Sequence, residues 1–437
     1  MADTARAAAL KILQDVEDGA FLNLSLKKRL AAVGEQDRRF CARLANMTVE
    51  NLLRIDYVID RFTEGKRVHR LIRNILRLGV CQLLFFESVP ESAAVNESVK
   101  LCASSAKRQL KGFVNAVMHN IARNKDNIAY PDRETQFEKY LSVYHSYPEW
   151  LVKKYITDYG RDFAEAMLSY RRQPVTCVRA NRLKMTPEEL DKRLEKFEVT
   201  KGAYAEDARY IRNITAIDDL EEYRNGEMTV QGESSMLTVD AAMIEKGDHV
   251  IDVCAAPGGK SAYAAQKLPG YLFSADLHGH RVQLMDLNFE RLGVKADTHR
   301  MDAAVPNPKF YGKFDRVLTD VPCSALGLLY RKADIKYSKT EDDTQHLIEV
   351  QREILETSSR YVKPGGTLVY STCTINVHEN DENVDDFLKR HPQFVEKDLS
   401  EALPNVPKDR IRGGRLQLFP HLDGIDGFFI AALERKK

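Results

Sequence analysis

Two cysteines and a carboxylate are the residues of this chain whose chemistry stands out. Cys323 closes the segment DVPC that begins with Asp320, and Cys373 closes the segment STC at 371–373. Each segment follows an apolar stretch typical of a buried strand. A thiolate is a strong nucleophile near neutral pH, although a buried cysteine is more often an inert, small apolar side chain. Two thiols at such strand ends favour the nucleophilic interpretation.

A third apolar stretch, ending at Asp252, leads into a loop that contains glycines. The loop residues are Cys254, Ala255, Ala256, Pro257, Gly258, Gly259 and Lys260. Glycine lets the backbone approach a ligand closely, and the helix expected from Ser261 would offer N–H groups to it. A phosphate-binding GxxxxGK[ST] loop needs Gly at position 254, where Cys stands, and GxGxxG is absent as well. The loop is therefore predicted to bind a ligand by means other than phosphate contacts.

Two further carboxylates fit an adenosine-containing ligand. Asp276 ends the next apolar stretch, 24 residues after Asp252. That is close to the spacing at which an acidic residue accepts the ribose hydroxyls of a nucleotide. Asp302 follows a further short strand and could reach an adenine amino group, although a single Asp at a strand end often caps a turn instead. Both interpretations of Asp302 stay open.

The elements that must position these residues follow an α/β rhythm. Strands are expected at 249–255, 271–277, 314–320 and 366–372, with helices beginning at Ser261, Arg281 and Glu379. Alternating strands and helices indicate a doubly wound α/β domain. In such sheets the ligand lies beyond the carboxyl ends of the strands. The chemistry-bearing residues all fall at those ends.

The rest of the chain predicts a multidomain protein. Ile55, Val58, Ile59 and Phe62 have helical spacing, as do several other stretches before residue 130. The expected division is an all-α domain at 1–130, a helical linker at 131–173, a small α+β subdomain at 174–235 and the α/β domain at 236–437.

Composition narrows the class of protein. The 437 residues suffice for about three domains, and 43% apolar with 30% charged residues is typical of a globular chain. No run reaches the ~18–20 apolar residues of a membrane span, and Met1-Ala2-Asp3 leads into a charged amphipathic stretch. We expect a soluble, cytoplasmic protein. Seven cysteines without a CxxC pair predict neither a disulfide framework nor a metal site.

The charge is divided unevenly. Residues 1–130 hold 21 Lys and Arg against 14 Asp and Glu, a net +7, whereas the remainder holds 44 against 50, a net −6. A basic first part permits binding to nucleic acid, and a solvated basic face would explain the same charge.

The motifs together resemble a known family. The segments DVCAAPGGKS, DVPCS, STC and the closing DGFFIAAL are similar to those of the RNA cytosine-5 methyltransferases, the Nol1/Nop2/Sun (NSUN) family, over about 145–437. The helical first part, with LKILQDVEDGAFLN and KGFVNAVMHNI, resembles a NusB-type RNA-binding domain. The resemblance implies a Rossmann-like class I methyltransferase domain that uses S-adenosyl-L-methionine.

The same resemblance implies a role for each site residue. Cys373 would be the nucleophile and Cys323 would assist product release, with Asp320 and Lys260 also catalytic. The cofactor would be held by Cys254, Ala255, Ala256, Pro257, Gly258, Gly259, Lys260, Asp276, Asp302 and Asp320. The chain departs from the family pattern at Gly232, often acidic, at Val321, commonly Ala, and at Ala333, usually Pro.

The reaction itself requires these residue types. C5 of cytosine is a weak nucleophile, so a thiolate must first add at C6. Asp320 can stabilise the electron density that this addition moves into the ring, and Lys260 can supply positive charge. After methyl transfer the C5 proton must leave so that the enzyme thiol can be eliminated, and Cys323 could assist this step or act as the base. A duplex would hide C6, so the target should be a cytidine in a loop or one flipped out of its stack.

The substrate is less closely defined than the chemistry. The pairing of a NusB-like part with the methyltransferase part resembles bacterial members that methylate a cytidine of 16S rRNA, which we therefore expect as the partner of a monomeric enzyme. A tRNA cytosine-5 methyltransferase would carry a similar catalytic domain. A non-catalytic RNA-binding assembly factor would not need Cys323, Cys373, Asp320 and Lys260 together.

Overall fold

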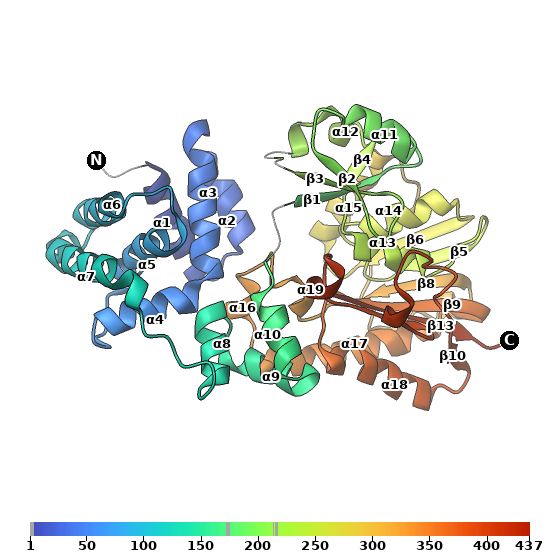
Figure 1. Ribbon diagram of the computed structural model, residues 1–437. Helices are drawn as coiled ribbons and strands as arrows, with labels where there is room; N and C mark the ends of the chain where they lie inside the picture. The colour runs from blue at the N-terminus through green and yellow to red at the C-terminus, as the bar shows by residue number, and fades with distance from the viewer. Residues whose placement is uncertain (1–3, 172–174, 213, 215–216) are drawn as a thin grey trace. The chain divides into compact units, whose positions relative to one another are not determined.

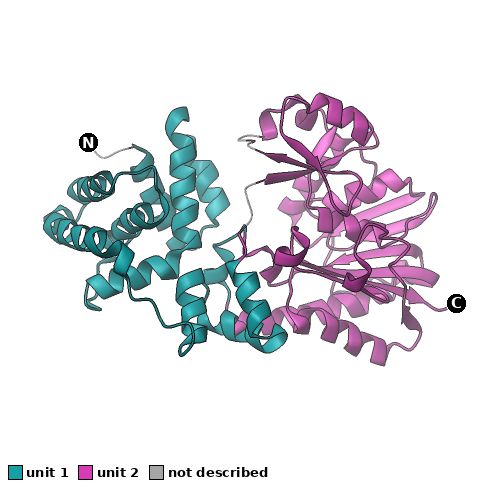
Figure 2. Ribbon diagram, in the orientation of Figure 1, with its two compact units in different colours: residues 1–169, 331–339 teal, residues 170–330, 340–437 magenta. Residues whose placement is uncertain are grey.

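The computed structural model describes residues 4–171, 175–212, 214 and 217–437. The expected boundary at 173/174 and the first three residues lie outside the described residues. Two compact units divide the chain (Figure 2): the first contains Met1–Ser169 and Arg331–Lys339, and the second contains Tyr170–Tyr330 and Thr340–Lys437.

The regular elements among the described residues of the first unit are all helices (Figure 1). Its α-helices are α1 (Thr4–Glu17), α2 (Leu22–Leu30), α3 (Glu35–Glu50), α4 (Leu52–Phe62), α5 (Arg70–Phe85), α6 (Glu91–Ala103), α7 (Lys111–Asn124), α8 (Phe137–His145), α9 (Glu149–Tyr159), α10 (Arg161–Ser169) and α16 (Ile335–Ser338). The apolar spacing that predicts α4 reflects burial of one face of this helix, because Ile55, Val58 and Ile59 are fully buried in the core. The stretch with helical spacing at 92–123 forms two helices, separated by a 3-10 turn at Arg108–Leu110.

A short segment distant in sequence belongs to this helical unit. Arg331–Lys339, which includes α16, lies within it. Ala333 joins the apolar core, and the Tyr337 hydroxyl lies 2.9 Å from Ser146 Oγ. Lys336 is 1% exposed, with its Nζ 3.9 Å from the ring centre of Tyr147. The domain expected at 236–437 thus contains nine residues that pack with the helical unit.

The second unit begins with a small α+β part. Its four antiparallel strands pair in the order β2-β3-β1-β4. The strands are β1 (Val175–Ala180), β2 (Val199–Lys201), β3 (Ala208–Arg212) and β4 (Met228–Val230), accompanied by α11 (Pro187–Arg193) and α12 (Glu221–Arg224). Thr186 and Glu189 form a capping box at the start of α11, and this explains why the helix begins at Pro187.

The larger sheet of this unit forms the centre of the expected α/β domain. Its main path runs β11-β12-β13-β9-β8-β5-β6-β7, and β10 pairs with β13. The strands are β5 (His249–Asp252), β6 (Tyr271–Asp276), β7 (Asp297–Arg300), β8 (Phe314–Asp320), β9 (Val362–Thr372), β10 (Phe394–Glu396), β11 (Ile411–Arg412), β12 (Arg415–Leu418) and β13 (Phe428–Arg435). Neighbours from β7 to β9 are parallel, whereas β13 runs antiparallel to β9. The closing DGFFIAAL therefore extends the parallel core into a mixed sheet.

Helices cover both faces of this sheet. Figure 1 shows α14 and α15 on one side and α17 and α18 on the other. The helices of the domain are α13 (Glu233–Asp240), α14 (Gly259–Ala264), α15 (Gly279–Leu292), α17 (Glu341–Ser359), α18 (Asp381–Arg390) and α19 (Pro420–Asp423). The helix expected from Ser261 begins two residues earlier, because Gly258 adopts φ +98° and turns the chain directly into α14. The helix expected from Glu379 begins at Asp381, after a 3-10 turn at Val377–Glu379.

Candidate active site

The two cysteines meet because of the register of two parallel strands. Asp320 at the end of β8 pairs with Ser371 of β9, so the residues that follow leave the sheet side by side. The Sγ atoms of Cys323 and Cys373 lie 3.3 Å apart, and both residues are partly exposed. The contact with Cys373, together with burial, raises the pKa of Cys323 well above its usual value. Cys323 therefore holds its proton at neutral pH.

An ion pair lies at the same strand end. Lys260 Nζ is 2.7 Å from Asp320 Oδ2, and Ser371 Oγ donates to Asp320 Oδ1 at 2.8 Å. Burial alone would lower the pKa of Lys260, but the charge of Asp320, with smaller contributions that include Cys373, raises it. Lys260 is thus a stable positive charge whose field reaches the thiol pair.

The loop from Cys254 to Lys260 joins β5 to α14. A Cβ added at Gly258 would lie 2.7 Å from Phe289 Cε1, so a larger side chain has no space there. Beneath the loop, Asp252 is fully buried and accepts a hydrogen bond from Ser261 Oγ at 2.7 Å. Burial raises the pKa of Asp252 to about 6. The loop therefore rests on a carboxyl group that titrates near neutral pH.

Asp276 is buried beside this loop. It is 3% exposed at the end of β6, and its Oδ1 accepts from the backbone N–H of His278 at 3.1 Å. Arg281 lies 3.2 Å from Asp276 Oδ2 and also donates to the carbonyl oxygen of Ala256 at 2.5 Å. Sequence reasoning missed Arg281, which joins the predicted ribose acceptor to the loop. The sequence does contain a signal for this contact, because Arg281 follows Asp276 by only five residues and lies in the first turn of α15.

Asp302 differs from Asp276 in its surroundings. It is exposed and lies two residues beyond β7, and its Oδ1 accepts from the backbone N–H of Ala304 at 3.0 Å. This is the turn-capping contact that was one of the two interpretations of Asp302. The capping contact leaves Oδ2 for another donor.

Sequence reasoning also missed Glu379, a fully buried carboxylate between the two cysteine segments. Its side chain accepts hydrogen bonds from Ser324 and Thr374, the residues directly after Cys323 and Cys373. In the sequence it lies in the acidic run HENDEN at the expected helix start, where a glutamate is usually a solvated capping residue. The pattern therefore held no signal for its burial.

The three departures from the family pattern lie in different surroundings. Gly232 precedes α13, and a Cβ added there would lie 3.0 Å from Asp426 Oδ2, so that another carboxylate already occupies this space. Val321 is buried, and its N–H donates to the carbonyl oxygen of Ser371 at 3.1 Å. Ala333 packs in the helical unit, as described above.

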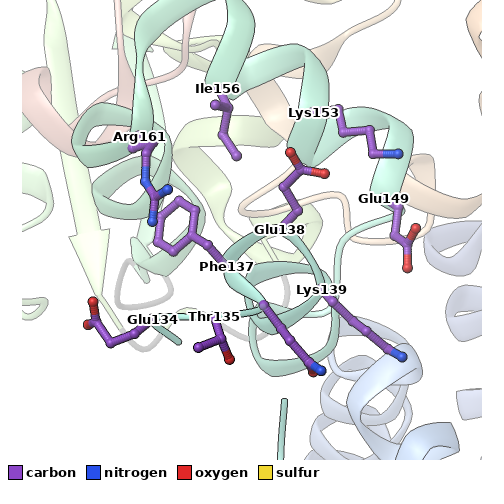
Figure 3. Close-up of a pocket in the computed structure, with 10 residues that line it drawn as sticks. Glu134, Thr135, Phe137, Glu138, Lys139, Glu149, Lys153, Ile156 and Arg161 are labelled. Atoms are coloured by element: carbon purple, nitrogen blue, oxygen red, sulfur yellow. The ribbon is translucent and has the colours of Figure 1, made fainter. Parts of the chain in front are cut away.

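A surface pocket of about 500 Å³ lies elsewhere, in the helical unit around α8 and α9 (Figure 3). Arg161 stands over the ring of Phe137 at 4.0 Å, and the pocket rim carries charges of both signs. The lining residues are Glu134, Thr135, Gln136, Phe137, Glu138, Lys139, Glu149, Lys153, Ile156 and Arg161. None of these belongs to the predicted site.

Among residues 4–171, 175–212, 214 and 217–437, there is no group of three His, Cys, Asp or Glu side chains that could hold a metal ion. None of the described helices is both long and apolar enough to span a membrane.

Comparisons with known proteins cover the whole chain. Three family models match: 16S rRNA methyltransferase RsmB/F at 241–434, the NusB family at 3–123 and the RsmF/B-like ferredoxin-like domain at 147–218. The probable ribosomal RNA small subunit methyltransferase B of Bacillus subtilis (strain 168) is 38% identical, over 99% of this chain and 98% of its own length.

Solved structures share the fold. The crystal structure of PH0851 is 24% identical, with a TM-score of 0.83 over 99% of this chain and 98% of its own. NSun6 from Pyrococcus horikoshii, solved with SFG, is 22% identical, with a TM-score of 0.60 over 67% of this chain and 99% of its own. The arrangement of the helical, ferredoxin-like and α/β parts along the chain thus has a counterpart of nearly equal length.

Proposed function

The chain belongs to the 16S rRNA methyltransferase RsmB/F family, and from this premise we propose that it transfers a methyl group from S-adenosyl-L-methionine to C5 of a cytidine in 16S rRNA, through a covalent bond between Cys373 and C6. That it is an rRNA small-subunit methyltransferase follows from the family. The observation that supports the finer proposal is the thiol pair, Cys323 and Cys373 at 3.3 Å, beside the Lys260–Asp320 ion pair.

The donor set fits S-adenosyl-L-methionine. Asp276 offers a buried carboxylate to the ribose hydroxyls, Asp302 offers an exposed one toward the adenine, and the loop from Cys254 to Lys260 lies between β5 and α14. Carboxylates at the ends of β5 and β8 favour the positive charge of a sulfonium group. When bound, this cofactor would supply the methyl group.

Cys373, Lys260 and Asp320 would each have a separate role in the addition to C6. The thiolate of Cys373 forms a bond to C6, and the displaced electron pair moves toward N3 and O2, where the charge of Lys260 stabilises it. Asp320 accepts hydrogen bonds from Lys260 and Ser371, so it acts here as an acceptor that orients Lys260.

Release reverses the addition. Once C5 carries the methyl group, a water molecule takes the C5 proton, the double bond between C5 and C6 forms again, and the sulfur of Cys373 leaves C6 with the electron pair of the broken bond. Because its raised pKa keeps the proton on Cys323, this thiol can donate a hydrogen bond to the departing sulfur 3.3 Å away and stabilise its negative charge. This is the product-release role proposed for Cys323.

Bisulfite sequencing tests the reaction and the substrate together. In a strain that lacks the protein, one cytidine of 16S rRNA should lose its protection from conversion, and wild-type protein should restore it whereas Cys373→Ala should not. A change confined to tRNA would assign a tRNA substrate instead. No change in either RNA would contradict methylation at C5 of cytidine.

The helical unit supports the choice of rRNA through its NusB family match and its excess positive charge. Lys27 and Lys28 are exposed on α2, so replacing both with Glu should weaken 16S rRNA binding and flatten its salt dependence. Cofactor binding should not change. Deleting residues 1–130 is a poorer test, because Ala333 and Lys336 would lose the core in which they pack.

Asp276 tests the cofactor site. Asp276→Asn should weaken S-adenosyl-L-methionine binding by about 1–3 kcal/mol, because an NH₂ donor replaces one of the two buried oxygens that would accept from the ribose hydroxyls. Asp302→Asn is the matched control at an exposed position and should have a smaller effect. Calorimetry on the two folded variants measures their affinities for the cofactor. Equal affinities for Asp276→Asn and wild type would contradict the assignment of Asp276 to the cofactor site.

A further inference from the structure

One buried carboxylate connects both cysteine segments. Glu379 Oε2 accepts from the backbone N–H of Ser324 at 2.9 Å and from Gln351 Nε2 at 2.8 Å. Its Oε1 accepts from Asn376 Nδ2 at 2.9 Å, from Thr374 Oγ1 at 3.3 Å and from the hydroxyl of Ser324. Five donors therefore converge on a single side chain.

These donors come from both sides of the thiol pair. Ser324 directly follows Cys323, and Thr374 directly follows Cys373. The two hydroxyls also lie 2.8 Å from each other. Gln351 of α17 adds a third attachment, since its Nε2 donates to the carbonyl oxygen of Pro322 at 3.0 Å as well as to Glu379. The network thus links both loops to α17.

The described donors to the Glu379 carboxylate are all neutral. A buried carboxylate without a cationic partner is costly unless its oxygens are fully hydrogen-bonded, as they are here. Such a group stabilises only the conformation that keeps every donor in place. Displacing either loop would leave a buried charge without part of its hydrogen bonding.

We propose that Glu379 is a positioning residue that holds the Cys323 loop against the Cys373 loop and so sets the distance between the two thiols. The consequence for catalysis rests on the proposed function, but the distance itself does not. Among the described residues, Glu379 makes no hydrogen bond to the Lys260–Asp320 pair or to either sulfur, but its charge contributes to the raised pKa of Cys323. Removing that charge would favour the Cys323 thiolate and speed disulfide formation, so a slower reaction would report a change in geometry.

Glu379→Gln is the informative substitution because it keeps the shape and reverses the hydrogen bonding. An amide NH₂ in place of Oε2 would face the N–H groups of Ser324 and Gln351, and in place of Oε1 it would face the amide of Asn376. In either orientation the new NH₂ group faces another N–H group, and no acceptor lies between the two donors. Glu382→Gln is the matched control, since Glu382 is half-exposed three residues later and pairs with His378 at 2.8 Å.

Disulfide trapping of the full-length protein measures the proposed effect without any RNA. Diamide takes two electrons and two protons from the two thiols as the S–S bond forms, and peptide mass spectrometry quantifies the bond between Cys323 and Cys373. Since disulfide formation depends steeply on geometry, Glu379→Gln should form this bond about tenfold more slowly than wild type. Glu382→Gln should match wild type. A folded Glu379→Gln protein that forms the bond at the wild-type rate would overturn the proposal.

Kinetics then connect the geometry to catalysis. Glu379→Gln should lower kcat by about 10–100-fold, with the KM for RNA and the affinity for the cofactor nearly unchanged. If the Glu379→Gln protein does not fold, Ser324→Ala and Thr374→Val each remove one hydroxyl of the network, and trapping at the wild-type rate in both would reject the role of Glu379. If wild-type protein methylates no cytidine, the proposed function fails, while the trapping rates still decide for or against Glu379.

Discussion

Five of the seven cysteines lie in two regions that give this side chain different surroundings. Cys41, Cys81 and Cys102 are buried in the apolar core of the helical unit. Cys323 and Cys373 are partly exposed at the ends of two adjacent parallel strands. In the helical core, Cys81 has the Thr48 hydroxyl as a hydrogen-bond partner and Cys102 Sγ donates to the carbonyl oxygen of Lys107 at 3.5 Å. At the strand ends the two thiols contact each other, and the Lys260–Asp320 ion pair lies at the same edge.

The two regions raise the pKa of a thiol for different main reasons. Burial raises the pKa of Cys81 to about 12, so this residue remains a small apolar side chain. The pKa of Cys323 is raised as well, first through its contact with Cys373 and then through burial. The partner of Cys81 is the Thr48 hydroxyl, whereas Cys323 lies 3.3 Å from a second sulfur.

The largest effect should come from Cys373. Cys373→Ala should lower the methylation rate on the order of 10³-fold or more and abolish any covalent protein–RNA species, because no bond to C6 can form. Methyl incorporation into 16S rRNA and denaturing electrophoresis measure the two effects. Residual adduct in this variant would assign the nucleophile to another residue.

Cys323 should behave in the opposite way toward the adduct. Cys323→Ala should still form the bond between Cys373 and C6 but release it slowly, so that a protein–RNA complex accumulates and turnover falls by about 100-fold. The double variant should accumulate none. If the covalent protein–RNA complex accumulated in Cys373→Ala and not in Cys323→Ala, the roles assigned to the two cysteines would have to be exchanged.

A smaller effect should appear in the pH dependence of stability. Asp252 has a pKa of about 6 in the folded protein against an ordinary 3.8, so the folded state binds the extra proton between these values. Stability should therefore fall as the pH rises from 4 to 6, by up to about 3 kcal/mol from this group. Asp252→Asn should remove that contribution. Urea unfolding at several pH values tests this, and identical profiles for both proteins would contradict it.

The smallest effect should come from the helical core. Cys81→Ala leaves a small cavity and should lower the free energy of unfolding by about 1 kcal/mol, with methylation unchanged. Urea unfolding and the methylation assay measure the two quantities. A stable Cys81→Ala protein that had lost methylation activity would contradict the prediction that the core cysteines contribute to stability and not to catalysis.

Local patterns in the sequence were sufficient for the elements and for the residue types at their ends. Apolar stretches predict β5, β6, β8 and β9, and DVCAAPGGK, DVPC and STC follow three of them directly. Parallel strands bring their carboxyl ends to one edge of the sheet, so these segments could be expected to meet. The family and the fold class followed from the same segments and are confirmed.

Other features were decided by tertiary structure alone. The 3.3 Å approach of the thiols depends on the β8–β9 register, and the burial of Glu379 depends on donors from two loops and α17. The packing of Arg331–Lys339 in the helical unit joins residues nearly two hundred positions apart, such as Ser146 and Tyr337. Local spacing encodes which face of a strand or helix is apolar, but it does not encode which distant polar groups satisfy a buried charge, because those contacts form only when the chain has packed.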